Sequence, residues 1–320
     1  MDTLPATDLR RVPAQTFTMG SDRHYLEERP ARRVEVDAFD IETVAVTNMR
    51  YARFVRDTGY VTVAERPLDP AEFPGAPSEN LQPGSLVFTR TPGPVDLRHL
   101  DQWWTWTPGA CWCHPEGPAS SIADRGDHPV VHIAHEDART YAKWAGRSLP
   151  TEAQWEAAAR GGLDQAEFTW GNDPESETEA LANFWHGDFP WRPTPGYGRT
   201  TAVGSYPPNG YGLHNMAGNV WEWTADWYAE KQSDAGQSCC APRNPRGPQM
   251  EDSLDPGQPW TRIPRKVVKG GSFLCADSYC RRYRPAARRP QAIDTGTSHI
   301  GFRCVRTPAE LPRQAPQGPR

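Results

Sequence analysis

The chain is organised around one stretch, Gly270-Gly271-Ser272-Phe273-Leu274-Cys275-Ala276-Asp277-Ser278-Tyr279-Cys280-Arg281-Arg282-Tyr283-Arg284, which runs on through Pro285-Ala286-Ala287-Arg288 to Gly301-Phe302-Arg303-Cys304. After a Gly-Gly turn, two thiols stand five positions apart beside a serine, a tyrosine and several arginines. Nearby cations lower the pKa of a thiol and raise its thiolate fraction, and a core strand has no use for such a cluster. We therefore expect Cys275 and Cys280 to form the chemical centre.

Charge and hydropathy exclude several classes of partner. The 320 residues carry a formal net charge of -5, whereas a nucleic-acid-binding domain requires a basic patch. The sequence has no apolar run long enough to cross a membrane, and residues 1–8 lack the basic and apolar regions of a secretory signal. We expect a cytoplasmic protein, acting as a monomer, with no nucleic-acid or membrane partner.

Composition favours an irregular fold. The 33 prolines are about twice the average share of roughly 5%, which indicates many turns and few long helices. The 13 tryptophans supply large flat side chains that cover loop-rich backbone. Seven cysteines, an odd number in a reducing compartment, make an extensive disulfide framework unexpected.

Local patterns predict a few short elements. Residues 16–21, 33–39 and 128–133 have the character of strands. Helices are predicted from Thr47 to Gly59, over 135–145, and from Thr151 to Gly161, each bounded by cap signals or a closing glycine. Residues 67–126 are proline-rich without a sustained period, and residues 306–320 are predicted to be a disordered tail.

A short loop before the thiol stretch has the composition of a calcium site. In 215–223, Asn215 and Glu222 are separated by Gly218. Calcium takes carboxylate, amide and backbone carbonyl oxygens, so Asn215, Glu222 and the carbonyls of Gly218 and Val220 are candidate ligands. The alternative is a tight turn into a Trp-rich strand.

Two other clusters invite a metal interpretation but are incomplete. Cys111-Trp112-Cys113-His114 resembles half of a zinc signature, yet no second ligand pair follows at zinc-finger spacing. His128, His132 and His135 stand close in sequence, but no carboxylate accompanies them at a known metal spacing, so we interpret them as structural.

Ligand chemistry alone leaves four interpretations of Cys275 and Cys280. They are a disulfide, which a reducing compartment disfavours; half of a zinc site, whose other ligands are missing; a copper(I) site with an open position; and a redox-active dithiol without metal.

The same residues resemble the formylglycine-generating enzyme (sulfatase-modifying factor) family. The resemblance is carried by the stretch from Gly270 to Arg288 and by His299-Ile300-Gly301-Phe302-Arg303-Cys304. It extends to residues 212–223, 149–156, 128–132 and 45–48, in the same order along the chain. The cysteine pair within its flanks is specific to this family, whereas the Trp-Glu-Trp and Leu-Pro-Thr-Glu segments mark a broader superfamily.

The resemblance implies a fold and an activity. The fold would be a single irregular α+β domain of the C-type-lectin-like group over 14–305, after an N-terminal extension over 1–13. The activity would be oxidation by molecular oxygen of a cysteine in a Cys-x-Pro-x-Arg segment of an unfolded sulfatase. The product would be Cα-formylglycine, and an external reductant would be needed.

It also implies roles for individual residues. Cys275 and Cys280 would bind copper(I), and the substrate thiol would take the open position. Ser272 and Tyr279 would line the oxygen and thiol pocket, Arg282 would support its charge, and Trp221 would form a wall. Cys304 would be a free buried thiol, and His299 stands where many members have asparagine near the pocket.

The family's calcium ligands fall on the loop noted above, at Asn215, Gly218, Val220 and Glu222. A second calcium site would use Asn183 with the carbonyls of Phe184 and Tyr197, although its aspartate ligand is missing from 193–196. Two alternative functions use the same kind of domain. One is a non-catalytic lectin-like binding module, and the other is an iron-dependent sulfoxide synthase, which needs a further helical domain with a three-histidine site.

Overall fold

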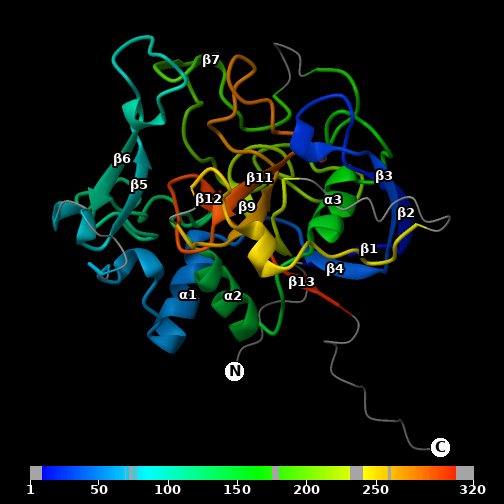
Figure 1. The fold of residues 1–320 in the computed structure, drawn as a ribbon, viewed down its shortest axis with the longest axis horizontal. Helices are drawn as coiled ribbons and strands as arrows, with labels where there is room; N and C mark the ends of the chain where they lie inside the picture. Colours follow the sequence, from blue (N-terminus) through cyan, green and yellow to red (C-terminus); the bar gives the residue numbers. More distant parts are fainter. Residues whose placement is uncertain are drawn as a thin grey trace, which may run out of the picture.

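The computed structural model describes residues 9–68, 70–71, 75, 78–174, 180–230, 241–258 and 261–307. The predicted tail beyond Thr307, the first eight residues and the pair Cys239-Cys240 lie outside these ranges. Short strands, single turns of 3₁₀ helix and long connections surround one central sheet, with the α-helices at its periphery (Figure 1).

The central sheet holds both ends of the thiol stretch. Its strand order is β11 (Arg288–Ala292), β10 (Arg265–Lys269), β9 (Trp221–Trp227) and β12 (Ile300–Gly301). β10 pairs antiparallel with β11 and β9, and β12 pairs parallel with β9. The thiol stretch is therefore the connection from β10 to β11, and the candidate calcium loop leads directly into β9.

A second sheet corrects the expected start of the domain. β1 (Leu9–Val12) pairs antiparallel with β4 (Phe39–Glu42), whose other edge pairs with β13 (Val305–Arg306). Residues 9–12, expected to belong to an N-terminal extension, complete this sheet, and Val12 is fully buried in the core. The sequence concealed this because three of the four residues of β1 are at least partly exposed and two are arginines.

Three two-stranded hairpins complete the sheets. They are β2 (Gln15–Met19) with β3 (Arg32–Val36), β5 (Gly84–Phe88) with β6 (Trp104–Pro108), and β7 (Gly187–Asp188) with β8 (Arg192–Pro193). The β2–β3 pair confirms the two strands predicted there. The β5–β6 hairpin lies within the stretch that we expected to lack regular structure. Its strands are separated by fifteen residues, and the turn signal Pro92-Gly93-Pro94 stands near the start of this long connection rather than in a tight loop between two strands.

The three predicted helices are present. α1 (Asn48–Thr58) is capped by Thr47, whose Oγ1 accepts from the Arg50 N–H, and ends at Gly59 in the left-handed conformation. α3 (Glu152–Arg160) begins with a capping box of Thr151 and Gln154 and ends at Gly161. α2 is His135–Trp144. Five short 3₁₀ segments are also described: η2 (Leu26–Glu28), η3 (Val63–Glu65), η4 (Ser78–Leu81), η5 (Leu100–Gln102) and η7 (Met250–Ser253).

The strand expected over 128–133 does not form. Pro129 makes one isolated bridge to Thr47, and the backbone turns at His132, which has a positive φ of 59°. Proline cannot donate to a ladder, and a left-handed residue breaks the extended path. The segment is instead held by separate backbone hydrogen bonds: the Val130 N–H donates to the Val46 carbonyl and the His132 N–H to the Thr297 carbonyl.

Two groups of contacts tie the helices to the site. α1 and α2 share an aromatic core in which Tyr51 stacks on Tyr141 at 5.7 Å, and Phe302 packs edge-on against both. α3 packs between the β2–β3 hairpin and the central sheet. There the buried Glu156 pairs with Lys269 at 2.9 Å, directly before the Gly-Gly turn. No helix among the described residues has the length and apolar character that a membrane crossing requires.

Candidate active site

The structure brings the two predicted thiols together. The Sγ atoms of Cys275 and Cys280 lie 3.3 Å apart, and the two residues are only 1% and 8% exposed. A disulfide requires an S–S distance of about 2.05 Å, so the pair is reduced. Of the four interpretations, the disulfide is therefore not the state seen here.

The backbone between β10 and β11 folds to make this approach possible. Gly271 has a φ of +72°, and a Cβ at this position would lie 2.9 Å from the Arg282 carbonyl oxygen. Ser272 Oγ accepts from the Leu274 N–H at 3.2 Å, and its carbonyl accepts from the Cys275 N–H. The Cys280 N–H then donates to the Ala276 carbonyl, which closes the turn between the two thiols.

The two thiols differ in protonation. The pKa of Cys280 is lowered to about 6, first by the hydrogen bond from Cys275 and further by the charge of Arg282. Burial raises the pKa of Cys275 well above its usual value. The surroundings therefore favour the thiolate form at Cys280 over Cys275.

Arg282 acts on Cys280 from one side of the pair. Its Nη1 lies 3.7 Å from Cys280 Sγ, while its other nitrogens bind Glu27 at 2.6 and 3.1 Å. The guanidinium also stacks on the Tyr25 ring, 3.7 Å from the ring centre. These contacts from η2 and the residue before it hold the cation beside the thiolate.

A cavity of about 30 Å³, room for one or two water-sized molecules, opens on the thiols. Five of the six residues predicted for the site line it: Cys275, Cys280, Ser272, Tyr279 and Trp221. Arg282 is not on its wall. The remaining walls are formed by Leu100, Trp103, Trp104, Phe189, Leu274, Arg289 and His299.

Several of these wall residues were missed from the sequence. Phe189 stacks on Tyr279 at 4.7 Å, and Trp103 meets both rings edge-on. Arg289 follows Arg288 on β11, and alternation along a strand sends the two side chains to opposite faces. The tryptophans in 103–106 indicate that this segment covers other residues, but the sequence does not indicate that it covers the thiol pair.

His299 is buried beside Trp104, with ring centres 4.8 Å apart. Its Nδ1 contacts Thr297 Oγ1 at 2.5 Å. Burial, with the nearby charge of Arg289, lowers the pKa of His299 well below its usual value. The imidazole is therefore neutral at physiological pH and is not a proton donor to the site.

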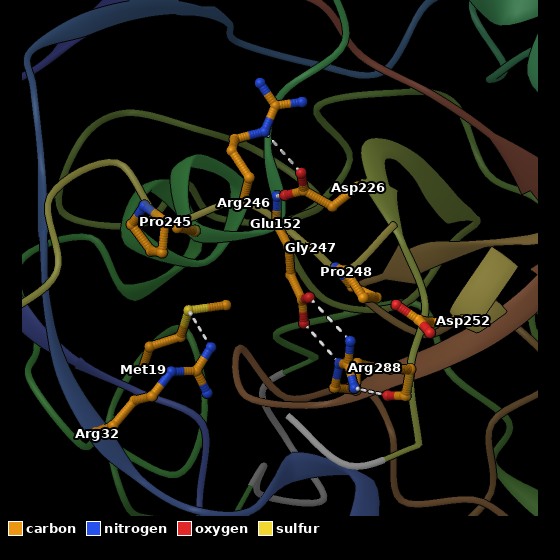
Figure 2. A pocket seen from close by; sticks show the side chains of 12 residues that line it. Met19, Arg32, Glu152, Asp226, Pro245, Arg246, Gly247, Pro248, Asp252 and Arg288 are labelled. Carbon is orange, nitrogen blue, oxygen red and sulfur yellow. Dashed lines mark hydrogen bonds and ion pairs between the residues drawn. The ribbon is translucent and has the colours of Figure 1, made fainter. Parts of the chain in front are cut away.

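A larger cavity of about 400 Å³ lies elsewhere and contains no predicted site residue (Figure 2). Its charges are largely paired internally. Arg288 binds Glu152 at 2.7 and 3.1 Å, and Arg246 binds Asp226 at 2.8 Å. Its chemistry is that of a salt-bridged surface hollow.

The candidate calcium loop packs against the thiol stretch. The Gly218 N–H donates to the Gly270 carbonyl at 2.8 Å, and the Phe273 N–H donates to the Asn219 carbonyl at 3.0 Å. Glu222 binds Arg303 through both oxygens, at 2.7 and 2.8 Å, and accepts from Trp155 Nε1. A carboxylate has about four lone-pair positions, so three donors leave one for a cation.

The second candidate calcium residue, Asn183, carries an unused ligand atom. Its Nδ2 donates to the Arg199 carbonyl and to Asn219 Oδ1, but its buried Oδ1 accepts from no described residue. Its backbone carbonyl accepts from the Asn219 N–H at 2.6 Å. The two candidate calcium segments are therefore in direct contact.

The other sequence candidates separate into two groups. His132 is buried, with Nδ1 on Ser85 Oγ and Nε2 on the Pro115 carbonyl, both at 2.8 Å. His128 contacts Thr200, and the ring of His135 packs on Trp223. These histidines do not converge. Cys111 and Cys113 do come together, with their Sγ atoms 3.4 Å apart.

The thiols of the Cys111–Cys113 pair also shift each other's pKa in opposite directions. The hydrogen bond from Cys113 lowers the pKa of Cys111 to about 6, and the same bond raises the pKa of Cys113. Cys304, in contrast, is a fully buried free thiol, as expected, and its burial raises its pKa.

Comparison with known proteins agrees with this architecture. PvdO from Pseudomonas aeruginosa has a similar fold, with a TM-score of 0.58, 22% identity and 93% of each chain covered. The fold class is therefore α+β and irregular, of the C-type-lectin-like kind. The family described as "Sulfatase-modifying factor enzyme 1-like domain" matches residues 2–308. Fold and thiol pair together define a sulfatase-modifying-factor domain.

Curated relatives narrow this class. The formylglycine-generating enzyme of Mycobacterium tuberculosis is 51% identical over 306 residues, which cover 94% of this chain and 98% of that protein. The formylglycine-generating enzyme of Thermomonospora curvata is 44% identical over 303 residues, covering 93% and 92%. The chain belongs to the formylglycine-generating enzyme family.

Proposed function

We propose that this protein is an oxidase that converts a cysteine in a Cys-x-Pro-x-Arg segment of an unfolded sulfatase to Cα-formylglycine, using molecular oxygen. The observation that carries the proposal is the buried pair Cys275 and Cys280, whose sulfurs lie 3.3 Å apart on a small cavity. Membership of the family supports the same reaction. A purely structural thiol pair would need neither the cavity nor the adjacent cation.

The donor set fits copper(I). Two thiol sulfurs, one of them held as a thiolate, are soft ligands of the kind that copper(I) prefers. No other cysteine or histidine joins them closely enough to complete a zinc site within the described residues. Copper(I), held by Cys275 and Cys280, would supply redox chemistry toward oxygen and an open position for the substrate thiol.

The chain's own residues prepare that position. Arg282, 3.7 Å from Cys280 Sγ, favours the thiolate form and offsets the charge that a third thiolate would bring. Trp221, Trp103 and Phe189 line the cavity with apolar rings. Its volume suits a diatomic molecule, and Ser272 and Tyr279 supply the nearby hydroxyl groups.

The reaction balance explains why a reductant is required. Converting a CH₂–SH group to an aldehyde releases the sulfur as hydrogen sulfide and takes up one oxygen atom. The second atom of dioxygen leaves as water, which consumes two further electrons and two protons. We therefore propose an external reductant as the source of those electrons.

Calcium would have a supporting role. Asn183 Oδ1 is a buried amide oxygen without a described donor, and a cation bound there with the carbonyls of Phe184 and Tyr197 would satisfy it. Asn215, Glu222 and the carbonyls of Gly218 and Val220 would bind the other ion. Because this loop is hydrogen-bonded to Gly270 and Phe273, calcium bound there would stabilise the thiol stretch.

Mass spectrometry of a Cys-x-Pro-x-Arg peptide tests the activity. After incubation with copper-loaded protein, air and reductant, the peptide should lose one sulfur and two hydrogens and gain one oxygen. Cys304→Ser is the matched control, because this thiol is buried away from the cavity. An unchanged peptide mass with copper-loaded protein would refute the activity and favour a non-catalytic module.

A further inference from the structure

A second thiol pair lies outside the site described above. Cys111 and Cys113 occupy a tight turn, closed by hydrogen bonds from the Cys111 N–H to the His114 carbonyl at 3.2 Å and back at 3.1 Å. Their sulfurs are 3.4 Å apart and not bonded, and Cys113 is only half-buried. The turn alone therefore presents two soft ligands near the surface.

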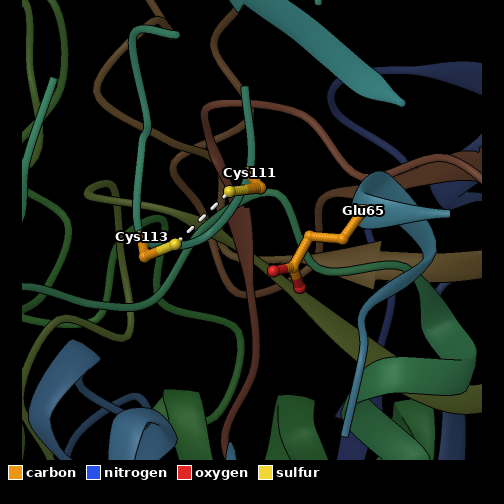
Figure 3. Close-up of side chains that lie close together, drawn as sticks. All are labelled: Glu65, Cys111 and Cys113. Carbon is orange, nitrogen blue, oxygen red and sulfur yellow. Dashed lines mark hydrogen bonds between the residues drawn. The ribbon is translucent and has the colours of Figure 1, made fainter. Parts of the chain in front are cut away.

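A carboxylate from another part of the chain completes the cluster. Glu65 ends η3, and one of its oxygens lies with both sulfurs in a group whose ligand atoms are all within 4.8 Å of one another (Figure 3). Among the described residues, this is the one group of three or more His, Cys, Asp and Glu side chains with that spacing. His114, the ligand suggested by sequence, is not in it, since its Nδ1 contacts the Ser120 carbonyl.

The carboxylate is held in place before any ion arrives. Glu65 Oε2 accepts from the Thr62 N–H at 3.0 Å and from Thr62 Oγ1 at 2.6 Å, the contacts of a capping box. Its other oxygen accepts from no described residue. Fixed ligands lose less conformational entropy on binding, which favours affinity.

The charge of the cluster also calls for a cation. Within the described part of the chain, no basic side chain forms an ion pair with Glu65, and the adjacent Arg66 binds Glu136 instead, at 3.0 Å. Two thiol groups and an unpaired carboxylate thus lie together. A carboxylate held beside two sulfurs without a counter-charge is costly, and a bound metal ion relieves that cost.

We propose that Cys111, Cys113 and Glu65 form a binding site for a borderline-soft divalent cation, with Zn²⁺ as the best match. Zinc accepts both thiolate and carboxylate ligands, whereas copper(I) does not favour the carboxylate. Tetrahedral zinc with Zn–S bonds of about 2.3 Å separates two sulfurs by about 3.8 Å, close to the distance present here. The half-exposed side of Cys113 leaves the fourth position to water.

Zinc titration of the reduced whole protein, in competition with a chromophoric chelator, tests this site. The titration is done in a Cys275→Ser/Cys280→Ser background, so that the first pair does not bind. We expect one equivalent of Zn²⁺, and loss of that equivalent on adding Cys113→Ser. In the otherwise unchanged protein, Cys113→Ser should remove one equivalent while leaving peptide oxidation intact.

Glu65→Gln is the decisive variant, because glutamine also serves at this position of a capping box and keeps the segment folded. The substitution should weaken Zn²⁺ binding at least about tenfold. Losing a residue that only hydrogen-bonds to a metal ligand already lowers metal affinity by about that factor, and Glu65 is proposed to bind the ion directly. Unchanged affinity in Glu65→Gln would overturn the three-ligand site. The proposal would also be overturned if Cys113→Ser bound as many equivalents of Zn²⁺ as the protein without this substitution. It would be overturned as well if Cys111 and Cys113 formed a disulfide that persists in reductant.

Discussion

The two thiol pairs of this protein have nearly the same geometry and opposite surroundings. The sulfurs are 3.3 Å apart in Cys275–Cys280 and 3.4 Å apart in Cys111–Cys113. The first pair is buried beside Arg282, with Arg289 on the same cavity. The second is near the surface beside Glu65. The sulfur spacing therefore does not set the chemistry, and the charge and access around the sulfurs do.

The difference extends to the scaffold. The first pair stands on a connection within the central sheet, fixed by contacts from residues 218–219 and by Trp185, whose N–H donates to the Cys275 carbonyl at 2.7 Å. The second pair stands on a self-contained turn. A site that must exclude water and orient a substrate needs the first arrangement, whereas a site that only binds an ion does not.

Exchanging one sulfur in each pair should give the largest contrast. Cys280→Ser removes a soft ligand and should lower the rate of peptide oxidation by more than about 100-fold. That factor is the upper range for losing a residue that only hydrogen-bonds to a metal ligand, and Cys280 is proposed to bind the metal directly. Cys113→Ser should leave that rate within about twofold of the original protein. The measurement is product formation by mass spectrometry at equal concentrations of protein and added copper(I). Equal losses in both variants would show that the two pairs act as one system.

Removing the cation from the first pair should have the next largest effect. Arg282→Gln deletes the charge that helps to lower the pKa of Cys280, so this pKa should rise from about 6. A return to about 8 reduces the thiolate fraction at pH 7 about tenfold. The rate of Cys280 alkylation in metal-free protein should still increase with pH, but the midpoint of that increase should lie at a higher pH than in the original protein.

Arg289→Gln is the graded control for that experiment. Arg289 also lowers the pKa of Cys280, but it ranks after Arg282 among the causes. Its removal should therefore displace the alkylation profile in the same direction by a smaller amount. A profile that is unchanged in Arg282→Gln would show that the Cys275 hydrogen bond alone holds the thiolate.

What could be predicted from the sequence followed the range of each interaction. α1 and α3 have their signals within one turn, at Thr47 and Gly59 and at Thr151 and Gly161, so their bounds were predictable. The β5–β6 hairpin and β1 depend on partners far along the chain and were missed. The prediction of a strand over 128–133 was wrong because the backbone turns at His132, despite the β character of the residues around it.

The residues of the site also divide into those that the local sequence identifies and those that only the fold brings together. The residues near Cys275 were found because they share one contiguous stretch, and the resemblance to a family supplied Trp221. Trp103, Phe189 and Arg289 reach the cavity from separate segments, which no spacing rule reports. Glu65 was missed for the same reason, since it stands 46 positions before Cys111 and only the fold brings the two together.

Backbone strain offers a smaller and more local test of the two scaffolds. Gly271→Ala places a Cβ at a φ of +72° and 2.9 Å from the Arg282 carbonyl and the Tyr283 backbone, so the thiol turn must shift. We expect a loss of about 1–2 kcal/mol in unfolding free energy, together with reduced oxidation. Gly146→Ala has a similar φ of +66° with open space around it, and should lose stability without losing activity. Equal activity losses in the two would contradict a special role for the turn.

The smallest expected effect comes from one hydroxyl group at the first pair. Tyr279→Phe keeps the ring that stacks on Phe189 at 4.7 Å and packs against Trp103, so the melting temperature should be unchanged. The hydroxyl itself is lost from the cavity, and with it the hydrogen bond that we propose it donates to oxygen or the substrate thiol, worth about 1 kcal/mol or roughly a fivefold decrease in kcat/KM. Zinc binding at Cys111 and Cys113 should not change in the same variant. A decrease in kcat/KM accompanied by a lower melting temperature would assign Tyr279 to packing, whereas a decrease at constant stability assigns its hydroxyl to the reaction.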